Sequence, residues 1–184
     1  MSTRRVRIVL LCEDSQQEAF TRRFLEGMGW NTRELRVEKS PSAKGSAAQW
    51  VKKQFPKQLG IYRARRSRAA SGLIVMIDAD LREVQERKRE FEEECNSQGV
   101  QYREVEDAVA ITIPRRNIET WIHYLNGEQV FETKLYQKLE KERLCRSAVS
   151  ELVRMCQANG LPQDAPPSLP SACEEYGTRI RPLA

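Results

Sequence analysis

The sequence predicts one α/β domain of the Rossmann-like, three-layer type, with a mainly parallel sheet and a C-terminal helical extension. Short apolar runs alternate with amphipathic stretches over the first 126 residues. These stretches are long enough to carry the chain back across a parallel sheet as helices. Of the 184 residues, 40% are hydrophobic and 31% are charged, which is typical of a globular domain with its own core.

The first strand and helix follow from the N-terminal pattern. The apolar run Arg7–Cys12 is short and leads into acids, as in a strand buried on both faces. A capping box at 15–18 precedes apolar residues at every fourth position, so we expect a helix over 15–28, closed by Gly29. Apolar residues alternate with charges at 35–37, which predicts a second, half-exposed strand.

The middle of the chain repeats this alternation. A capping box at 46–49 opens a helix that Pro56 should interrupt or kink. The run 73–77 is the most hydrophobic strand of the protein. Asp80 is the expected N-cap of a long helix that ends at Gly99. The apolar face expected for this helix consists of Leu81, Val84, Phe91 and Cys95.

One more strand and helix complete the alternation. Apolar residues at 109, 111 and 113 predict a strand that Pro114 stops. A short helix is expected over 118–125, ending at Asn126 and Gly127.

The C-terminal part has a different pattern. Two helical stretches are expected at 133–144 and 147–159, before a proline-rich segment at 162–170. We therefore divide the chain into an α/β domain over residues 1–130 and a C-terminal helical cover and tail over residues 131–184, because too few residues remain for a second core.

Composition excludes several classes of protein. No apolar run approaches the roughly 20 residues of a membrane span, and the run ending at Cys12 is too short for a signal peptide, so we expect no membrane contact. The five cysteines are odd in number and never form a C-x-x-C pair, which indicates reduced thiols in a cytoplasmic protein. His123 is the single histidine, so any metal site must depend on carboxylates.

Acidic residues follow three of the predicted strands. Glu13 and Asp14 follow the first strand, Asp78 and Asp80 follow the most hydrophobic strand, and Glu119 lies in the first turn of the helix after the last strand. In parallel α/β sheets, ligands bind beyond the carboxyl ends of the strands. Hard cations such as Mg²⁺ bind carboxylate oxygens, so this placement predicts a shared metal site.

Each of these acids also has an ordinary structural explanation. Asp80 and Ser15 suit helix N-caps, and the helix macrodipole favours Glu119 near a helix start. Any one of the acids alone is more often structural than catalytic. The placement of all three clusters at one edge of one sheet favours the metal site.

Three segments that carry these acids resemble a known family. The apolar strand followed by Glu13 and a helix, and then the run 73–80, are similar to the Toprim (topoisomerase–primase) catalytic domain. The segment 113–121 resembles the compact Toprim-like proteins of prokaryotic defence loci, which carry a similar glutamate-x-tryptophan helix. The resemblance covers about residues 5–126 and rests on short motifs.

The resemblance implies a role for each acid. Glu13 matches the family glutamate, which serves in acid–base catalysis or metal binding, and Asp78 and Asp80 match the aspartate pair that binds Mg²⁺ or Mn²⁺. Glu119 would be a further catalytic acid. Asp14 stands where the family has glycine, which leaves open whether it is a fourth metal ligand or alters the turn.

The implied reaction is hydrolysis of a phosphodiester, in which metal lowers the pKa of a bound water and neutralises charge on the attacked phosphate. Topoisomerase-type covalent attack needs a tyrosine at the site, and Tyr124, five residues past Glu119 on a helix, should face elsewhere. The substrate would be nucleic acid, with DNA favoured over RNA. Because the chain has no ATPase motif of its own, the resemblance also implies an ABC-type ATPase as a partner.

A basic segment separates the first two acidic clusters. Between Lys39 and Ile77 there are nine lysines and arginines and no acid. Such segregation is typical of a phosphate-binding surface, although charge runs are more often solvated faces. The expected nucleic-acid-binding residues are Lys44, Lys52, Lys53, Arg63, Arg65, Arg66, Arg68, Arg115 and Arg116.

Three other functions fit parts of the pattern. A Toprim-like domain could bind nucleic acid or a partner without cutting. The N-terminal pattern also resembles a response-regulator receiver with Asp78 as phosphoacceptor, but the 65 residues between Glu13 and Asp78 are too many and the last strand lacks the expected lysine–proline. A haloacid dehalogenase-type phosphatase would use Asp78 as nucleophile, but that motif normally opens the fold and has a threonine where Arg82 stands.

Overall fold

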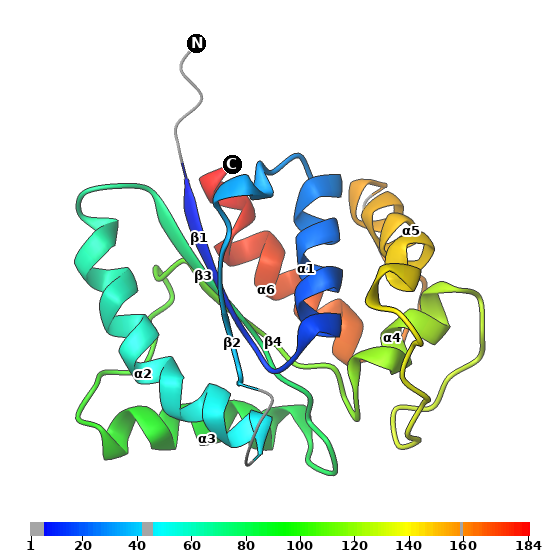
Figure 1. The fold of residues 1–184 in the computed structure, drawn as a ribbon, viewed down its shortest axis with the longest axis horizontal. Coiled ribbons are helices and arrows are strands. Elements are labelled where there is room, and N and C mark those ends of the chain that lie inside the picture. Colours follow the sequence, from blue (N-terminus) through cyan, green and yellow to red (C-terminus); the bar gives the residue numbers. More distant parts are fainter. Residues whose placement is uncertain (1–5, 42–45, 159) are drawn as a thin grey trace.

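Four parallel strands form the centre of the protein in a computed structural model, which describes residues 6–41, 46–158 and 160–184. The strands are β1 (Arg7–Cys12), β2 (Arg36–Lys39), β3 (Ser71–Met76) and β4 (Val109–Thr112), in the order β2-β1-β3-β4 (Figure 1). Every neighbouring pair is parallel. The predicted α/β class and mainly parallel sheet are therefore confirmed.

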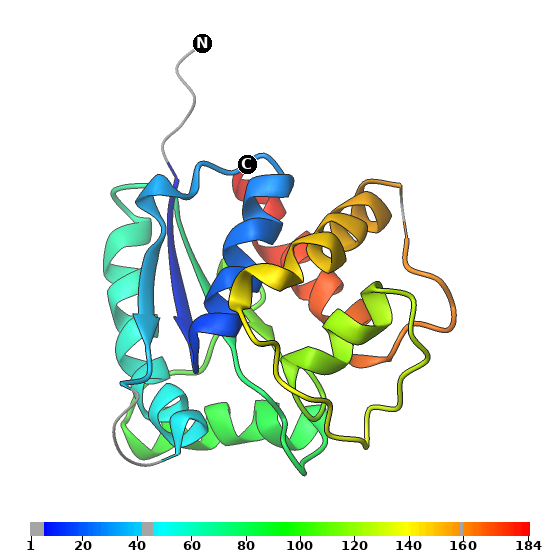
Figure 2. The same ribbon diagram turned by 45° about the vertical axis from the view of Figure 1, so that its right-hand side comes forward.

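Helices cover both faces of this sheet (Figures 1 and 2). Against one face pack α2 (Ala47–Arg66) and α3 (Val84–Ser97), and against the other pack α1 (Ser15–Gly27), α4 (Ile118–Leu125), α5 (Arg146–Gln157) and α6 (Ser168–Arg179). Three short 3₁₀ helices complete the order: η1 (Thr32–Glu34), η2 (Glu142–Cys145) and η3 (Arg181–Leu183). The result is a three-layer, Rossmann-like fold.

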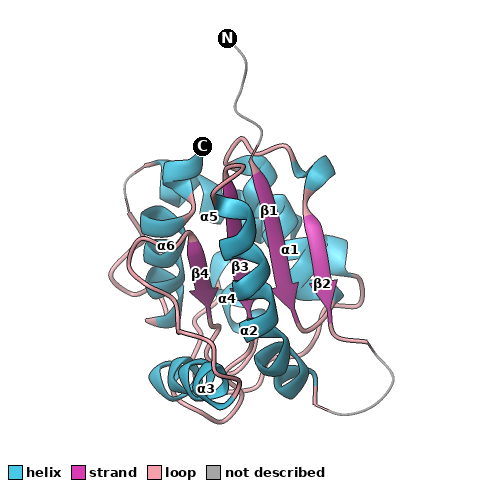
Figure 3. Ribbon diagram, turned by 90° about the vertical axis from the view of Figure 1, so that its left-hand side faces the viewer, coloured by secondary structure: helices cyan, strands magenta, loops and turns pink. Residues whose placement is uncertain are grey.

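The strand sequences explain the two cores. Successive side chains of a strand point to opposite faces, so Leu10 and Ile74 join the core under α1, while Leu11 and Val75 join the core under α2. All six residues of β3 are buried, as expected for a central parallel strand. The short β2 is the half-exposed strand that the sequence predicted, and it lies at the edge of the sheet (Figure 3).

Two predicted helix starts were wrong in detail. The side chain of Asp14, not Ser15, caps α1 by accepting from the backbone N–H of Gln17. The long helix begins at Val84, with a capping box between Glu83 and Glu86, because Asp80 adopts a left-handed conformation (φ 55°) that cannot open a helix. Leu81 therefore does not belong to the apolar face of that helix, and it is 86% exposed.

The helix around Pro56 is continuous. Ser46 caps α2 as predicted, and the helix runs through Pro56 to Arg66 without interruption. Its axis bends part-way along (Figure 1), which is consistent with the hydrogen bond that a proline removes from a helix interior.

The C-terminal segment differs most from its prediction. No α-helix occupies 133–144, where only η2 is helical, and α5 begins one residue earlier than expected. The sequence also failed to predict α6, which packs beside β4 within the first core. None of the helices in the described residues is both long and apolar enough to cross a membrane.

Candidate metal centre

Two carboxylates from neighbouring strands meet beyond the carboxyl edge of the sheet. Glu13 follows β1 and Asp78 follows β3, and the backbone N–H of Asp78 donates to Glu13 Oε1 at 2.5 Å. Between them lies Gln17, whose side-chain amide donates to Asp78 Oδ1 at 3.1 Å and to Glu13 Oε1 at 3.4 Å. Gln17 Oε1 in turn accepts from the backbone N–H of Glu13 at 2.9 Å. The two acids therefore share one buried amide as a clamp.

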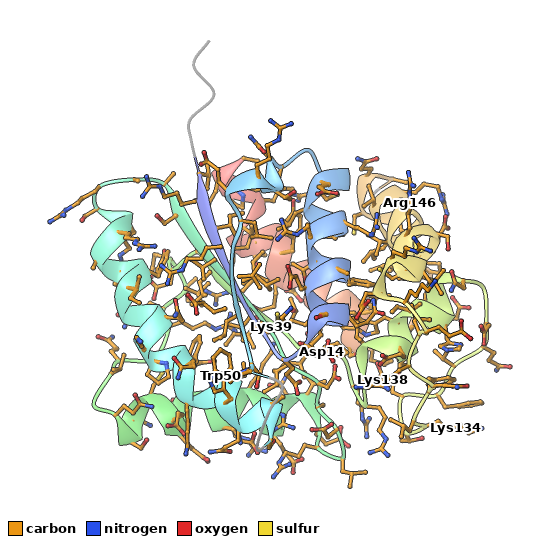
Figure 4. The ribbon with its side chains drawn as sticks, in the orientation of Figure 1. Asp14, Lys39, Trp50, Lys134, Lys138 and Arg146 are labelled. Carbon is orange, nitrogen blue, oxygen red and sulfur yellow. The ribbon has the colours of Figure 1, made fainter. Side chains whose placement is uncertain are left out.

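Two further acids lie close to this pair. Asp14 uses one carboxylate oxygen, Oδ1, to cap α1, and Figure 4 labels it at the start of that helix. Glu119 lies in the first turn of α4 and is only 2% exposed. The sequence prediction that Glu13, Asp14, Asp78 and Glu119 gather at one edge of the sheet is consistent with these positions.

Asp80 faces another way. Its carboxylate is 57% exposed and forms an ion pair with Arg87 at 3.0 Å. The buried Arg87 also donates to the backbone carbonyls of Asp78 and Ala79, so it fixes the turn that carries both aspartates. Asp80 still affects the site electrostatically, because its charge raises the pKa of Glu13.

The electrostatics of the site are unusual. Burial, opposed by the hydrogen bond from Asp78 and reinforced by the charge of Asp80, raises the pKa of Glu13 from 4.5 to about 7. Burial, and then the charges of Glu13 and Glu119, raise the pKa of Asp78 well above its usual value. Burial also raises the pKa of Glu119, and the charge of Asp14 adds to that shift. Each carboxylate makes its neighbours harder to ionise.

No lysine or arginine in the described part of the chain forms an ion pair with Glu13, Asp78 or Glu119. A buried carboxylate pair without a cation is costly, and a divalent cation would remove that cost. Mg²⁺ usually takes only one or two carboxylates, together with water and substrate phosphates, so the oxygen donors present suit such an ion. Within residues 6–41, 46–158 and 160–184, no three acidic, histidine or cysteine side chains converge into a ready-made metal-binding group.

The predicted basic residues divide between the two ends of the sheet. The chain leaves β2 at the carboxyl edge and must return to the start of β3, so α2 begins near the acids and ends at the amino edge (Figure 1). Lys52 and Lys53 lie in the first half of α2; Lys52 pairs with Glu90, and Lys53 is exposed. Lys44 lies outside the described residues.

The arginines at the end of α2 lie at the amino edge of the sheet, at the opposite end from Glu13 and Asp78. Arg63 and Arg66 form ion pairs with the buried Asp107, and Arg63 also donates to the carbonyls of Gln101 and Tyr102. These two residues therefore hold the loop before β4. Arg65 and Arg68 make no ion pair within the described residues.

Two arginines follow β4 at the carboxyl edge. Arg115 forms an ion pair with Glu83. Arg116 adopts a left-handed backbone conformation (φ 71°), and its carbonyl accepts from the backbone N–H of Asp80 at 3.1 Å. Arg116 Nε is buried without a hydrogen-bond partner among the described atoms. The two turns that flank the acids are thus tied together by strained residues, a feature that is common at functional sites.

Aromatic residues near the acids serve the core. Trp121 is 1% exposed and donates to Ser168 Oγ, so its ring belongs to the core. Tyr124 donates to Asp164, away from the acids, so it also faces elsewhere as expected.

Gln17 and Arg87 were not predicted as site residues. Both were visible as polar residues at core-facing helical positions: Gln17 precedes Phe20 and Phe24, and Arg87 precedes Phe91 on the buried face of α3. A polar side chain in such a position must find buried partners.

Comparisons of the chain with protein-family models, with curated proteins and with solved structures give no significant match.

Proposed function

We propose that this protein is a metal-dependent nuclease of Toprim type, which hydrolyses phosphodiester bonds with Mg²⁺ or Mn²⁺. The observation that supports this most directly is the buried pair of Glu13 and Asp78, whose negative charges no described cation neutralises. Such a pair is unstable on its own and suited to a hard divalent ion.

Each residue of the site has a role in this proposal. Glu13 and Asp78 would hold the metal, while Gln17 orients both carboxylates without adding charge. Asp80 is held at the rim by Arg87 and would serve as an outer ligand. Asp14, which caps α1, would be another. The ion, when bound, would lower the pKa of a water and neutralise charge on the attacked phosphate. Glu119 would act as a further acid group behind the pair.

Basic side chains near the acids would bind the substrate backbone. Lys39 donates to Ser15 and Glu18 in the first turn of α1, which Asp14 caps (Figure 4). The charge of Lys138 acts on Glu119. Arg115 and Lys53 lie at the same edge. These cations suit a nucleic acid, and DNA is favoured over RNA. A cytoplasmic location and an ABC-type ATPase as partner remain parts of this proposal.

Cleavage by matched variants tests the proposal. The wild-type protein is incubated with Mn²⁺ or Mg²⁺ and a panel of single- and double-stranded DNA and RNA, both alone and with any ATPase encoded beside it. Glu13→Gln and Asp78→Asn should each lower cleavage by ~10²-fold or more, the usual scale for a lost acid–base or ligand group. Glu93→Gln changes an exposed glutamate on α3 and should leave the rate unchanged.

Two results would contradict the proposal. Cleavage that survives undiminished in Glu13→Gln and Asp78→Asn would come from another site or a contaminant. Binding of nucleic acid without metal-dependent cleavage in any combination would instead support a Toprim-like domain that binds without cutting.

A further inference from the structure

Two cysteines that are 17 positions apart in the chain meet between α5 and α6. The Sγ atoms of Cys156 and Cys173 are 3.6 Å apart. Both side chains are partly exposed, whereas Cys12, Cys95 and Cys145 are buried. Among the described cysteines, these two therefore combine proximity with access to a reagent.

The surroundings leave room for the two sulfurs to join. A disulfide needs an S–S distance of about 2.05 Å, so the sulfurs must approach each other by roughly 1.5 Å. Cys173 borders an apolar cavity of about 40 Å³ between the sheet and the helices. Part of the surroundings of Cys173 is therefore empty, which leaves its side chain space to change rotamer.

We propose that Cys156 and Cys173 are a redox-active dithiol, which a small-molecule disulfide oxidises to an intramolecular disulfide that joins α5 to α6. The thiolate of Cys156 attacks one sulfur of the reagent, forms a mixed disulfide and releases one thiol. Cys173 then attacks Cys156 Sγ and releases the second thiol. The protein loses two hydrogen atoms, and the reagent is reduced to two thiols.

The local electrostatics suggest which sulfur attacks first. A hydrogen bond from the Cys173 thiol lowers the pKa of Cys156 against the effect of burial, and the charge of Arg181 lowers it further. The same hydrogen bond, with burial, raises the pKa of Cys173. Thiolates are the nucleophiles in disulfide exchange, so Cys156 should form the mixed disulfide and Cys173 should resolve it.

Thiol counting on the full chain tests the proposal. The protein is equilibrated with mixtures of oxidised and reduced glutathione, quenched with acid and unfolded, and its free thiols are titrated. The count should fall from five to three, and peptide mapping without reductant should recover Cys156 linked to Cys173. Closing a loop of this length should raise the melting temperature by roughly 6–12 °C, and dithiothreitol should reverse the rise.

Serine variants separate the two steps. Cys173→Ser should accumulate a mixed disulfide with glutathione at Cys156, while Cys156→Ser should accumulate much less at Cys173. Cys95→Ser removes a buried cysteine and should oxidise like the wild type. Five free thiols in the oxidised wild type, or a cross-link between other cysteines, would overturn the proposal even if a variant failed to fold.

Discussion

Buried carboxylates occur at both ends of the sheet, and the protein treats them in opposite ways. At the amino edge, the side chain of Asp107 is fully buried and is paired with Arg63 and Arg66, while the backbone N–H of Glu104 completes its hydrogen bonding. At the carboxyl edge, Glu13 and Asp78 share hydrogen bonds from neutral groups only. One end carries its own counterions, and the other lacks them.

The proposed function gives this difference a meaning: Asp107 belongs to a structural ion pair, and Glu13 and Asp78 to the proposed metal site. Removing a charge from water stabilises a fold only if a partner charge replaces the water. Asp107 has such partners, so its charge fastens the loop before β4 to the end of α2. The charges of Glu13 and Asp78 lower the free energy of unfolding unless a cation binds them. Under the proposed function, the carboxyl edge is less stable without its cation than with it.

The largest effect is expected at the amino edge. Asp107→Asn removes the charge that pairs with Arg63 and Arg66, so unfolding free energy should fall by about 3 kcal/mol, the scale for breaking a buried ion pair. Urea unfolding at pH 7.5 measures this change. Asp164→Asn, at an exposed aspartate, is the control and should change little. An Asp107→Asn protein with the same free energy of unfolding as the wild type would show that the ion pairs of Asp107 do not stabilise the fold.

Removing a carboxylate charge at the carboxyl edge should instead raise the free energy of unfolding. The pKa of Glu13 is about 7 in the folded protein and 4.5 ordinarily, so its ionisation costs nothing below pH 4.5. The wild type should then lose stability as pH rises from 4.5 through 7. Glu13→Gln removes this loss, and in metal-free buffer it should exceed the wild type by about 2–3 kcal/mol at pH 8 and match it at pH 4.

Metal provides the control for this experiment. Saturating Mn²⁺ should stabilise the wild type at pH 8 but not Glu13→Gln, because a ligand that binds only the folded state stabilises it. If Glu13→Gln is less stable than the wild type at pH 8 without metal, the charge of Glu13 stabilises the fold as the charge of Asp107 does. The two ends of the sheet would then not differ in this respect.

The sequence predicted those parts of the molecule that local patterns determine. The four strands and α4 follow from apolar runs that match the sheet and the buried helix face. It also placed Glu13, Asp78 and Glu119 at one edge, because parallel strands bring their carboxyl ends together. The predicted start of α3 was wrong. The backbone N–H of Asp80, which is left-handed, donates to the carbonyl of Arg116 in the turn after another strand, and local sequence does not reveal that contact.

Contacts between distant segments explain the remaining errors. Prolines made the segment at 162–170 appear non-helical, but Pro167 precedes α6 and Pro170 lies in its first turn, where the missing N–H has no partner to lose. The segment at 133–144 stays non-helical where its backbone binds elsewhere, for example where the carbonyl of Tyr136 accepts from Asn117. The opposite fates of Asp107 and Asp78 could not be predicted, because the residues around each come from several elements.

Gln17 allows a smaller and more specific test of the carboxyl edge. Gln17→Leu keeps the volume of the side chain but removes the amide that holds Glu13 and Asp78, so Mn²⁺ affinity should fall by about 10- to 100-fold, the usual scale for an outer partner of metal ligands. Gln16→Leu is the matched control, because Gln16 is also buried but its side chain donates to the carbonyl of Glu142. Calorimetry should separate the two variants; equal affinities would show that the clamp does not serve metal binding.

The smallest effect is expected for basic side chains on the surface around each end of the sheet. If nucleic acid binds over the acids, Lys39→Ala with Lys138→Ala should weaken binding and flatten its salt dependence, since each lost phosphate contact lowers the slope of log affinity against log salt by roughly 0.9 for duplex DNA. Arg65→Ala with Arg68→Ala removes the same charge at the amino edge and leaves the ion pairs of Asp107 in place. This second pair of changes should therefore leave the slope unchanged. Fluorescence anisotropy with a labelled duplex over a range of salt concentrations measures both slopes. The reverse result would place the nucleic acid on the arginines at the end of α2, away from the acids, and a metal at Glu13 and Asp78 would then have no phosphodiester within reach.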